Sequence, residues 1–476
     1  MEKLQALISS TNDIIWSYLL VGVLIICAVW FTVRSGFLQF RSVPEMLRLL
    51  TERRSKDSGK DGKRSISSFQ AFAVSIASRV GTGNLAGVAT AIVVGGPGAV
   101  FWMWMMALFG SASAFVESTL AQLYKRPAKD GTFIGGPAYY MERGIGKRWM
   151  GVLFAVLISI TFGFAFNSVQ SNTICASWEL AFNVPAQWMG IILTALTLVI
   201  IFGGIRRIAG VSSLLVPVMA LLYIALALII IAMNIGEIPK VLGLIVSDAF
   251  GFGDGNGGGW RELAGGGIGA TIMQGVKRGM FSNEAGMGSA PNVAATADTT
   301  HPVKQGLIQA LGVFTDTLVI CSCTAFIILI GGVSDASVDG IQLTQTALTA
   351  QIGPVGEIFI ALTILMFAFS SVIGNYYYGE ANIRFITKKK WVLNCYRILV
   401  AGMVLCGALI TLDLAWALAD LTMALMALCN LIAIMILSPQ AFRLLSDYRR
   451  QKKAGIRNPV FSKNSMPEIK DRLDCW

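Results

Sequence analysis

Two apolar stretches of this chain are interrupted by glycine and polar residues. The first reads SIASRVGTGNLAGVATAI over Ser75–Ile92, and the second contains GMFSNEAGMGSAP within Gly269–Asp298. Such interruptions are typical of a helix that unwinds for a few residues. The helix ends at a break offer backbone N–H groups to an anion, and the unwound carbonyl groups offer oxygen ligands to a cation. An amino acid carboxylate and a sodium ion suit these two kinds of end.

Composition places both interruptions inside a membrane protein. The chain has 476 residues, of which 55% are hydrophobic and only 14% charged, with a mean hydropathy of +0.65. Soluble domains carry roughly 25% charged residues. Apolar runs of about 20 residues recur along the sequence, and each is long enough to cross a bilayer as a helix. A β-barrel would instead show short alternating strands, so the sequence predicts an all-α polytopic membrane protein.

Eleven transmembrane helices are predicted, with centres near residues 23, 82, 110, 160, 195, 222, 275, 318, 365, 402 and 426. Most of the 38 Lys and Arg residues fall in alternate loops and in the C-terminal tail, which is the positive-inside pattern. This pattern predicts an N-terminus outside the cell and a cytoplasmic C-terminus. It also accounts for the net charge of +11 without nucleic acid. The stretch IQLTQTALTAQ (341–351) is expected to form a short helix over the outer mouth.

The two interruptions lie in predicted spans two and seven, five spans apart. This spacing is expected of an inverted repeat of five plus five helices, in which span one is an addition. Predicted units are therefore residues 1–67, the first helix and a basic loop; 68–437, the transport core; and 438–476, a basic tail. The alternative is that the glycines only allow close helix packing. Two clustered breaks at matching positions favour a binding site.

Three motifs resemble a known family. They are VGTGNLAGVATAI (Val80–Ile92), KRGMFSNEAGMGSAP (Lys277–Pro291) and FAFSSVIGNYYYGE (Phe367–Glu380). They are similar to those of the alanine or glycine:cation symporters, a family with the leucine-transporter fold, and the span count agrees along the whole chain. The resemblance implies sodium-coupled uptake of a small neutral amino acid across the inner membrane. A proton-coupled symporter of the same fold is the alternative, and a channel a weaker one.

The resemblance also implies which residues bind the ligands. The sodium ligands would be the backbone carbonyls and hydroxyls of two spans: Ala77, Val80, Ser370 and Ser371. Adjacent hydroxyls on a helix point about 100° apart, so Ser371 is expected to face the ion more fully. The amino acid would contact a second set, drawn from both breaks and two further spans: Gly81, Thr82, Gly83, Asn84, Gln170, Asn283, Glu284, Ala285, Gly286, Met287 and Asn375.

The third motif departs from the family at Asn375, where relatives often carry tryptophan. The smaller side chain predicts a larger pocket. Glu284 lies in the second break, where it either takes part in transport or caps a half-helix. Arg79 and Glu117 are expected to form a buried pair, and His301 to be a solvated loop residue. His301 cannot reach the membrane centre as a catalytic base, and no phosphate-binding loop or metal-ligand cluster occurs in the sequence, which argues against an enzyme or an ATP-driven pump.

Overall fold

The structure is a computed structural model that describes residues 8, 10–52, 66–128, 131–202, 205–252, 267–332 and 340–476. Half of the basic loop between the first two predicted spans, residues 53–65, and the glycine-rich stretch 253–266 lie outside the described residues. The regular elements of the described chain are helices, apart from one antiparallel pair of two-residue strands, β1 (Arg126–Pro127) and β2 (Phe133–Ile134), and one isolated bridge. The predicted all-α class is confirmed.

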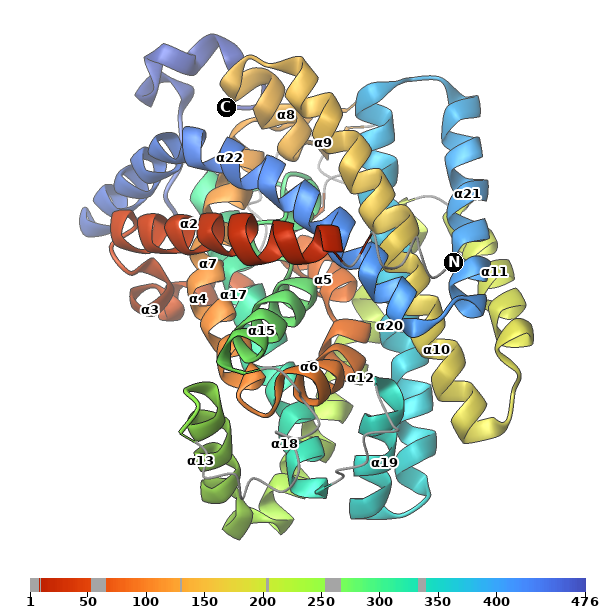
Figure 1. Cartoon of the computed structure of the whole chain (residues 1–476). Coiled ribbons are helices and arrows are strands. Elements are labelled where there is room, and N and C mark those ends of the chain that lie inside the picture. Colours follow the sequence, from red (N-terminus) through yellow and green to blue (C-terminus); the bar gives the residue numbers. More distant parts are fainter. Residues whose placement is uncertain are drawn as a thin grey trace.

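Figure 1 shows the helices in chain order, coloured from red at the N-terminus to blue at the C-terminus. Those of the first half are η1 Ile15–Leu20, α2 Val21–Arg34, α3 Leu38–Arg41, α4 Val43–Leu50, α5 Ser68–Arg79, η2 Gly83–Gly87, α6 Val88–Gly95, α7 Ala99–Leu123, α8 Pro137–Tyr140, η3 Met141–Ile145, α9 Arg148–Ile160, η4 Thr161–Phe166, α10 Asn167–Phe182, α11 Ala186–Ile201 and α12 Ile205–Met233.

Those of the second half are η5 Ile235–Glu237, α13 Ile238–Ala249, α15 Ile268–Asn283, α16 Ala290–Ala294, α17 Pro302–Val313, η6 Phe314–Cys321, α18 Ser322–Gly331, α19 Ile341–Ile352, α20 Val355–Ile386, α21 Lys390–Leu409, α22 Leu412–Lys453, η7 Lys463–Ser465 and η8 Pro467–Arg472.

Among the described residues, six helical segments are long and apolar enough to cross a membrane, and a bent pair (Pro217–Met233 with Ile235–Ala249) raises this to seven. Three shorter apolar helices add Val21–Arg34, Gly83–Gly95 and Ala186–Ile201. Ten of the predicted centres fall on helical segments, and the centre near residue 82 falls between α5 and η2; the total of eleven spans stays a prediction.

Both predicted interruptions are real breaks. The first helix, α5, begins at a capping box in which Ser67 and Gln70 exchange side-chain to backbone hydrogen bonds. It ends at Arg79 because Val80 is extended (ψ 102°), and the chain resumes as η2 and α6. In the second, α15 ends at Asn283, Glu284 is left-handed (φ 56°), and α16 starts at Ala290.

The breaks lie in the middle of a helical bundle. Helices α7, α10, α17, α20 and α22 surround them, and α7 packs against both α15 and α17. The predicted helix in 341–351 is confirmed as α19, and Thr344 on it donates to the carbonyl of Leu85 in η2 (3.2 Å). In Figure 1, α13 and α19 lie at one end of the molecule, while α8 and the C-terminus lie at the other.

Candidate functional site

The first break exposes backbone groups that a helix would otherwise pair. Gly81 N–H donates to Asn84 Oδ1 (2.9 Å), and Thr82 N–H donates to Gln170 Oε1 (3.0 Å). The Thr82 hydroxyl donates to the same Gln170 oxygen (2.7 Å). These side chains replace the lost helical partners, so the break is stable without a charged group. Gln170, predicted to reach the site from another span, is thereby placed directly on it.

Carbonyl oxygens of the break converge with two hydroxyls of α20. Ser370 Oγ lies 3.0 Å from Ala77 O, and Ser371 Oγ lies 3.4 Å from Ala77 O and 3.2 Å from Val80 O. Both hydroxyls also reach Phe367 O in their own helix, at 2.8 and 3.1 Å. Of the two serines, only Ser371 lies within reach of both carbonyls.

This cluster of four oxygens has the chemistry of a site for a hard cation. Oxygen ligands lie at about 2.3–2.6 Å from a cation of similar size such as Ca²⁺, so ligands at right angles are about 3.3–3.7 Å apart. The serine–carbonyl separations of 3.0–3.4 Å come close to that spacing. Each serine proton can point to Phe367 O, which leaves the hydroxyl lone pairs for an ion. The donor set therefore fits sodium.

Glycine is required where the first break meets its neighbours. A Cβ on Gly81 would lie 2.4 Å from Ser371 Oγ and 2.9 Å from Gln170 Oε1. A Cβ on Gly83 would lie 2.9 Å from the backbone Cα of Ser282 in α15. The two broken helices therefore touch through backbone at Gly83.

The second break is fixed by a carboxylate. Glu117 on α7 accepts from the N–H groups of Gly286 (3.3 Å) and Gly288 (3.0 Å), both at positive φ. Asn430 on α22 donates to Glu117 Oε2 (2.8 Å) and to Gly286 O (2.9 Å). Glu117 is fully buried. The carboxyl group of Glu117 therefore accepts the hydrogen bonds of the two amides that the break sets free.

Glu284 connects this break to the first one. Its carboxylate accepts from the Ser289 hydroxyl (2.6 Å) and from the Ser78 hydroxyl (3.3 Å) near the end of α5. The same Ser78 hydroxyl lies 3.3 Å from Asn375 Oδ1, and Asn375 Nδ2 donates to Asn167 Oδ1 (3.0 Å). Asn375 thus lies between α5 and α10, in contact with the partner of Glu284.

The remaining predicted site residues are buried but differ in what they offer. Asn84 Nδ2 donates to Asp316 (2.7 Å), so Asn84 braces the first break against η6. Asn283 Nδ2 donates to Thr317 Oγ1 (3.3 Å), and Asn283 Oδ1 accepts from the N–H of Ala285 (3.0 Å). Met287 is fully buried in the main apolar cluster. These contacts are intramolecular in the described state.

Two residues of this region were not assigned to a site from the sequence: Asp316, which was expected only to be a polar contact facing the bundle interior, and Asn430. Asp316 accepts from Ser282 (2.6 Å) and Asn84 (2.7 Å), and Asn430 holds the second break. The signal available was a lone polar residue in an apolar helix. A second signal comes from the structure. Asn84 and Asp316 lie on the short π-helical segments η2 and η6, and such segments are frequent at functional sites.

Two predictions about charged residues were wrong. Arg79 and Glu117 do not pair: Arg79 Nη1 donates to Gln309 O (3.3 Å), and Glu117 serves the second break. His301 is not solvated, since it is fully buried and its Nδ1 accepts from Val303 N–H (3.2 Å) at the start of α17. Burial among aromatic rings and the C-terminal tail removes His301 from water, which the sequence of its loop did not indicate.

The described state is closed around the site. Thr82, Gln170, Ser371 and Asn375 are each at most 3% exposed. On one side, Arg278 pairs with Asp420 (2.5 Å) and its guanidinium lies 3.9 Å from the Trp416 ring. Next to Trp416, the rings of Phe281, Phe166 and Phe162 stack in sequence, with centroid distances of 4.3 and 4.6 Å.

Comparison with known proteins gives the family. The chain matches the Sodium:alanine symporter family over residues 1–463. It is 53% identical over 479 residues to a "Probable sodium/glutamine symporter GlnT" of Bacillus subtilis (strain 168), covering 100% of this chain and 96% of that protein. The chain belongs to the sodium:alanine symporter family. This makes it a secondary transporter that couples amino acid symport to sodium.

Two further matches extend the comparison. The "Sodium/alanine symporter AgcS" of Methanococcus maripaludis is 37% identical over 441 residues, which are 91% of this chain and 94% of that protein. A solved structure of a mutant of the Eremococcus coleocola manganese transporter superposes with a TM-score of 0.53 at 13% identity, over 89% and 95% of the two chains. That likeness concerns the fold alone, which is the leucine-transporter fold predicted for this family member.

Proposed function

We propose that this symporter binds its sodium ion among the carbonyls of Ala77 and Val80 and the hydroxyls of Ser370 and Ser371. The observation that carries the proposal is the convergence of these four oxygens at 3.0–3.4 Å, at a point where α5 stops being helical. Sodium supplies one positive charge at the break, next to the polar ends that meet the substrate. The serines and carbonyls orient the ion and fix the distance between α5 and α20.

The amino acid is proposed to bind beside the ion, between the two breaks. Its carboxylate takes the place of Gln170 Oε1 at the Thr82 N–H and hydroxyl, two donors that already converge on one oxygen. Its ammonium group faces the unwound carbonyls of 283–287 and the carboxylate of Glu284. The close approach of Gly83 to Ser282 limits the side chain to a small one.

The substrate class follows from this limit on side-chain size and from the names of two relatives. Relatives bear the names of a sodium/glutamine and a sodium/alanine symporter, both for neutral amino acids. We infer a small neutral amino acid such as alanine or glycine, with glutamine as the larger competitor to test. Radiolabelled alanine uptake into proteoliposomes, in competition with all amino acids and with or without sodium, decides the class. Uptake that persists without any cation gradient would contradict the proposal.

Orientation is proposed from charge. The segments expected outside, in 237–262 and 331–354, lead into α13 and α19 at one end of the molecule, opposite the C-terminus (Figure 1). In the inner membrane, residues 1–67 then form an added helix and loop, 68–437 the transport core, and 438–476 a cytoplasmic tail. Single cysteines in 237–262 should react with an impermeant thiol reagent from outside, and those in 53–63 only after permeabilisation. The reverse pattern would reverse the orientation.

Proton coupling is the second candidate, and Glu284 is the observation that favours it. It is a carboxylate inside a break, bonded to Ser78 of the other broken helix. A 42% identical relative is named a "Putative sodium/proton-dependent alanine carrier protein YrbD". Proton-driven uptake would respond to an imposed pH gradient at constant sodium, and this response would be lost in Glu284→Gln. With sodium coupling, Glu284→Gln would weaken amino acid binding, because the ammonium loses a partner, but the uptake that remains would still depend on sodium.

A further inference from the structure

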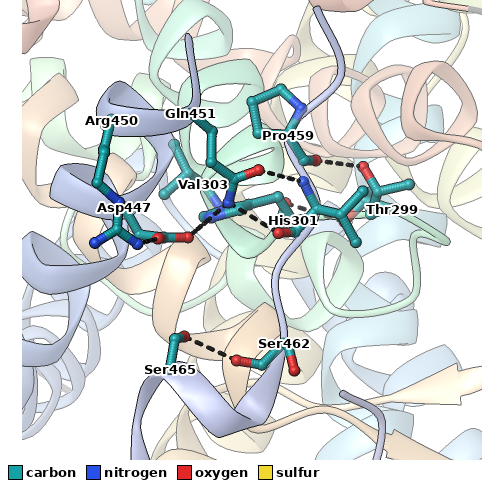
Figure 2. A network of polar contacts seen from close by, with 11 residues as sticks. Thr299, His301, Val303, Asp447, Arg450, Gln451, Pro459, Ser462 and Ser465 are labelled. Atoms are coloured by element: carbon teal, nitrogen blue, oxygen red, sulfur yellow. Dashed lines mark hydrogen bonds and ion pairs between the residues drawn. The ribbon is translucent and has the colours of Figure 1, made fainter. Parts of the chain in front are cut away.

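The part of the C-terminal tail that follows α22, residues 454–476, folds back onto the body of the protein. The side-chain amide of Gln451 on α22 donates to Val460 O and accepts from Val460 N–H (2.9 Å each). It also donates to the Asp447 carboxylate (2.8 Å), as Figure 2 shows. Thr300 lies just before α17. Its hydroxyl donates to Pro459 O, and its backbone carbonyl accepts from Phe461 N–H (2.9 Å each). The tail also buries four apolar side chains, each at most 6% exposed: Phe461, Met466, Ile469 and Leu473. A basic tail without structure would show none of these contacts.

The last residues of the tail reach the loop that follows α7. Asp474 pairs with Arg143 (2.7 Å) and Arg126 (3.2 Å). The indole N–H of Trp476 donates to Gln122 O (3.1 Å), and its ring centre lies 4.6 Å from the Lys125 ammonium. Lys125 is only 2% exposed, because the rings of Trp476 and Phe133 cover it. Burial lowers the pKa of Lys125 to about 8.

Gln122 and Lys125 are also the residues that fasten the second broken helix. Gln122 Nε2 donates to Ala294 O (2.5 Å) and Ala297 O (2.9 Å), and Lys125 Nζ donates to Ala297 O (3.2 Å). Ala297 lies just beyond α16, the short arm of the second break. The residues under Trp476 therefore hold the end of that arm.

The first broken helix is tied to the same point. Ile66, two residues before α5, forms a parallel bridge with Ala297, and Asp298 N–H donates to Ile66 O (3.0 Å). The arms of both breaks on the tail side therefore meet at Ala297. If the binding site opens toward that side, one of two movements is required. Either α5 separates from α16 at Ala297, or both helices move as a unit away from Gln122 and Lys125. Either movement disturbs the groups that Trp476 covers.

We propose that the C-terminal tail is a clasp that holds the site closed toward the cytoplasm, with Trp476 on Gln122 and Lys125 as its latch. The proposal uses the cytoplasmic placement of the tail from the proposed function, but not the sodium or substrate residues. Release of the tail favours the state open to the cytoplasm. By linkage, any partner that binds the released tail opens the transporter on that side.

The test is the reactivity of a cysteine at Ala73, a buried position on α5. It is placed in a full-length chain whose eight native cysteines are replaced, and inside-out vesicles receive a charged thiol reagent without sodium or amino acid. Trp476→Ala should raise the labelling rate about fivefold, as expected from losing one hydrogen bond and one cation–π contact. Trp476→Phe keeps the ring over Lys125 and should recover part of the protection.

Lys470→Ala is the matched control, since Lys470 is an exposed cation of the same tail. Equal labelling of Trp476→Ala, Trp476→Phe and Lys470→Ala, in protein that elutes as one folded species, would overturn the clasp. If Trp476→Ala does not yield folded protein, deletion of 474–476 replaces it with the same expectation. Failure of the proposed function looks different, because sodium-dependent uptake would then be missing in the unmodified protein while the labelling difference remained.

Discussion

Both helix breaks free backbone N–H and C=O groups from helical hydrogen bonds, but the two breaks differ in which side chains pair with these groups. At the first, the unpaired groups meet neutral partners: the Gln170 amide oxygen, the Asn84 amide and the hydroxyls of Ser370 and Ser371. At the second, two amides bind the carboxylate of Glu117 and a carbonyl accepts from Asn430. The first break is held by amide and hydroxyl groups that can exchange partners, and the second by one buried carboxyl group that accepts three hydrogen bonds.

The difference separates binding from architecture. A hydroxyl or amide can give up one neutral hydrogen bond to an ion or carboxylate at a net cost of about 1 kcal/mol. Removing a buried carboxylate from its donors costs more, because each donor is left without water. The first break is therefore suited to ligands that come and go, and the second to keeping two half-helices aligned while they do.

The largest expected effect is at Glu117. Glu117→Ala strips acceptors from the amides of Gly286 and Gly288 and from Asn430, so we expect a loss of about 3 kcal/mol or more in stability. The melting temperature of the purified protein should fall strongly. Glu117→Gln keeps one acceptor oxygen and should fall less. A Glu117→Ala protein that is fully stable and active would contradict the claim that the second break depends on Glu117.

The next effect concerns sodium. Ser371→Ala should raise the sodium concentration for half-maximal uptake about tenfold, which corresponds to roughly 1.4 kcal/mol of binding. Ser370→Ala should do less, because Ser370 reaches Ala77 O but not Val80 O. Folding should be unaffected in both.

Ser159 supplies the control for these serines. Its hydroxyl donates to Ala155 O in its own helix (2.7 Å), as a serine without an ion would do. Ser159→Ala should leave the sodium dependence unchanged. A sodium response that is identical in Ser159→Ala, Ser370→Ala and Ser371→Ala would place the ion elsewhere.

A smaller shift is expected at Asn375, which contacts Ser78 and Asn167 near both breaks. Asn375→Trp fills space next to the substrate and should shift relative kcat/KM toward alanine and glycine by about tenfold over larger amino acids. A size series of neutral amino acids measures this. Unchanged ratios would show that Asn375 does not border the substrate.

The smallest expected effect is a pH dependence on the arm that follows the second break. Burial lowers the pKa of His301 below its usual value near 6.5, although Asp447 lies 3.4 Å away. Its neutral form is favoured in the folded state, so its contribution to stability is present above pH 6.5 and declines as pH falls below it.

His301→Asn should remove this pH dependence while keeping a side-chain acceptor for Val303 N–H at the helix start. Thermal unfolding between about pH 4 and 7.5 measures the effect, because this range spans the window between the usual histidine pKa near 6.5 and the lowered pKa of His301, about 4. A steeper loss of stability on acidification in His301→Asn than in the unmodified protein would contradict the assigned sign.

The sequence was sufficient for the parts of the structure that depend on local pattern. Apolar length predicted the class, and clustered glycines at Gly81, Gly83, Gly286 and Gly288 predicted the two breaks. Family resemblance then supplied the serines of α20. The structure brings Ser371 within reach of Ala77 and Val80, although the sodium site itself stays a prediction.

Contacts between distant segments could not be predicted in this way. Glu117 reads as a lone charge in an apolar run, and only packing of α7 against the second break brings it to Gly286 and Gly288. His301 is buried because the tail returns over it, with the Phe461 ring edge-to-face against its ring at a centroid distance of 5.7 Å. Polarity of the tail gave no sign of that return.

Binding of radioactive sodium to the purified protein tests the central claim most directly, because it needs neither a membrane nor a known substrate. The account predicts saturable binding that weakens about tenfold in Ser371→Ala and remains in Glu284→Gln and Ser159→Ala. Sodium binding that is unchanged in Ser371→Ala, or lost in Glu284→Gln alone, would contradict a sodium site at the first break.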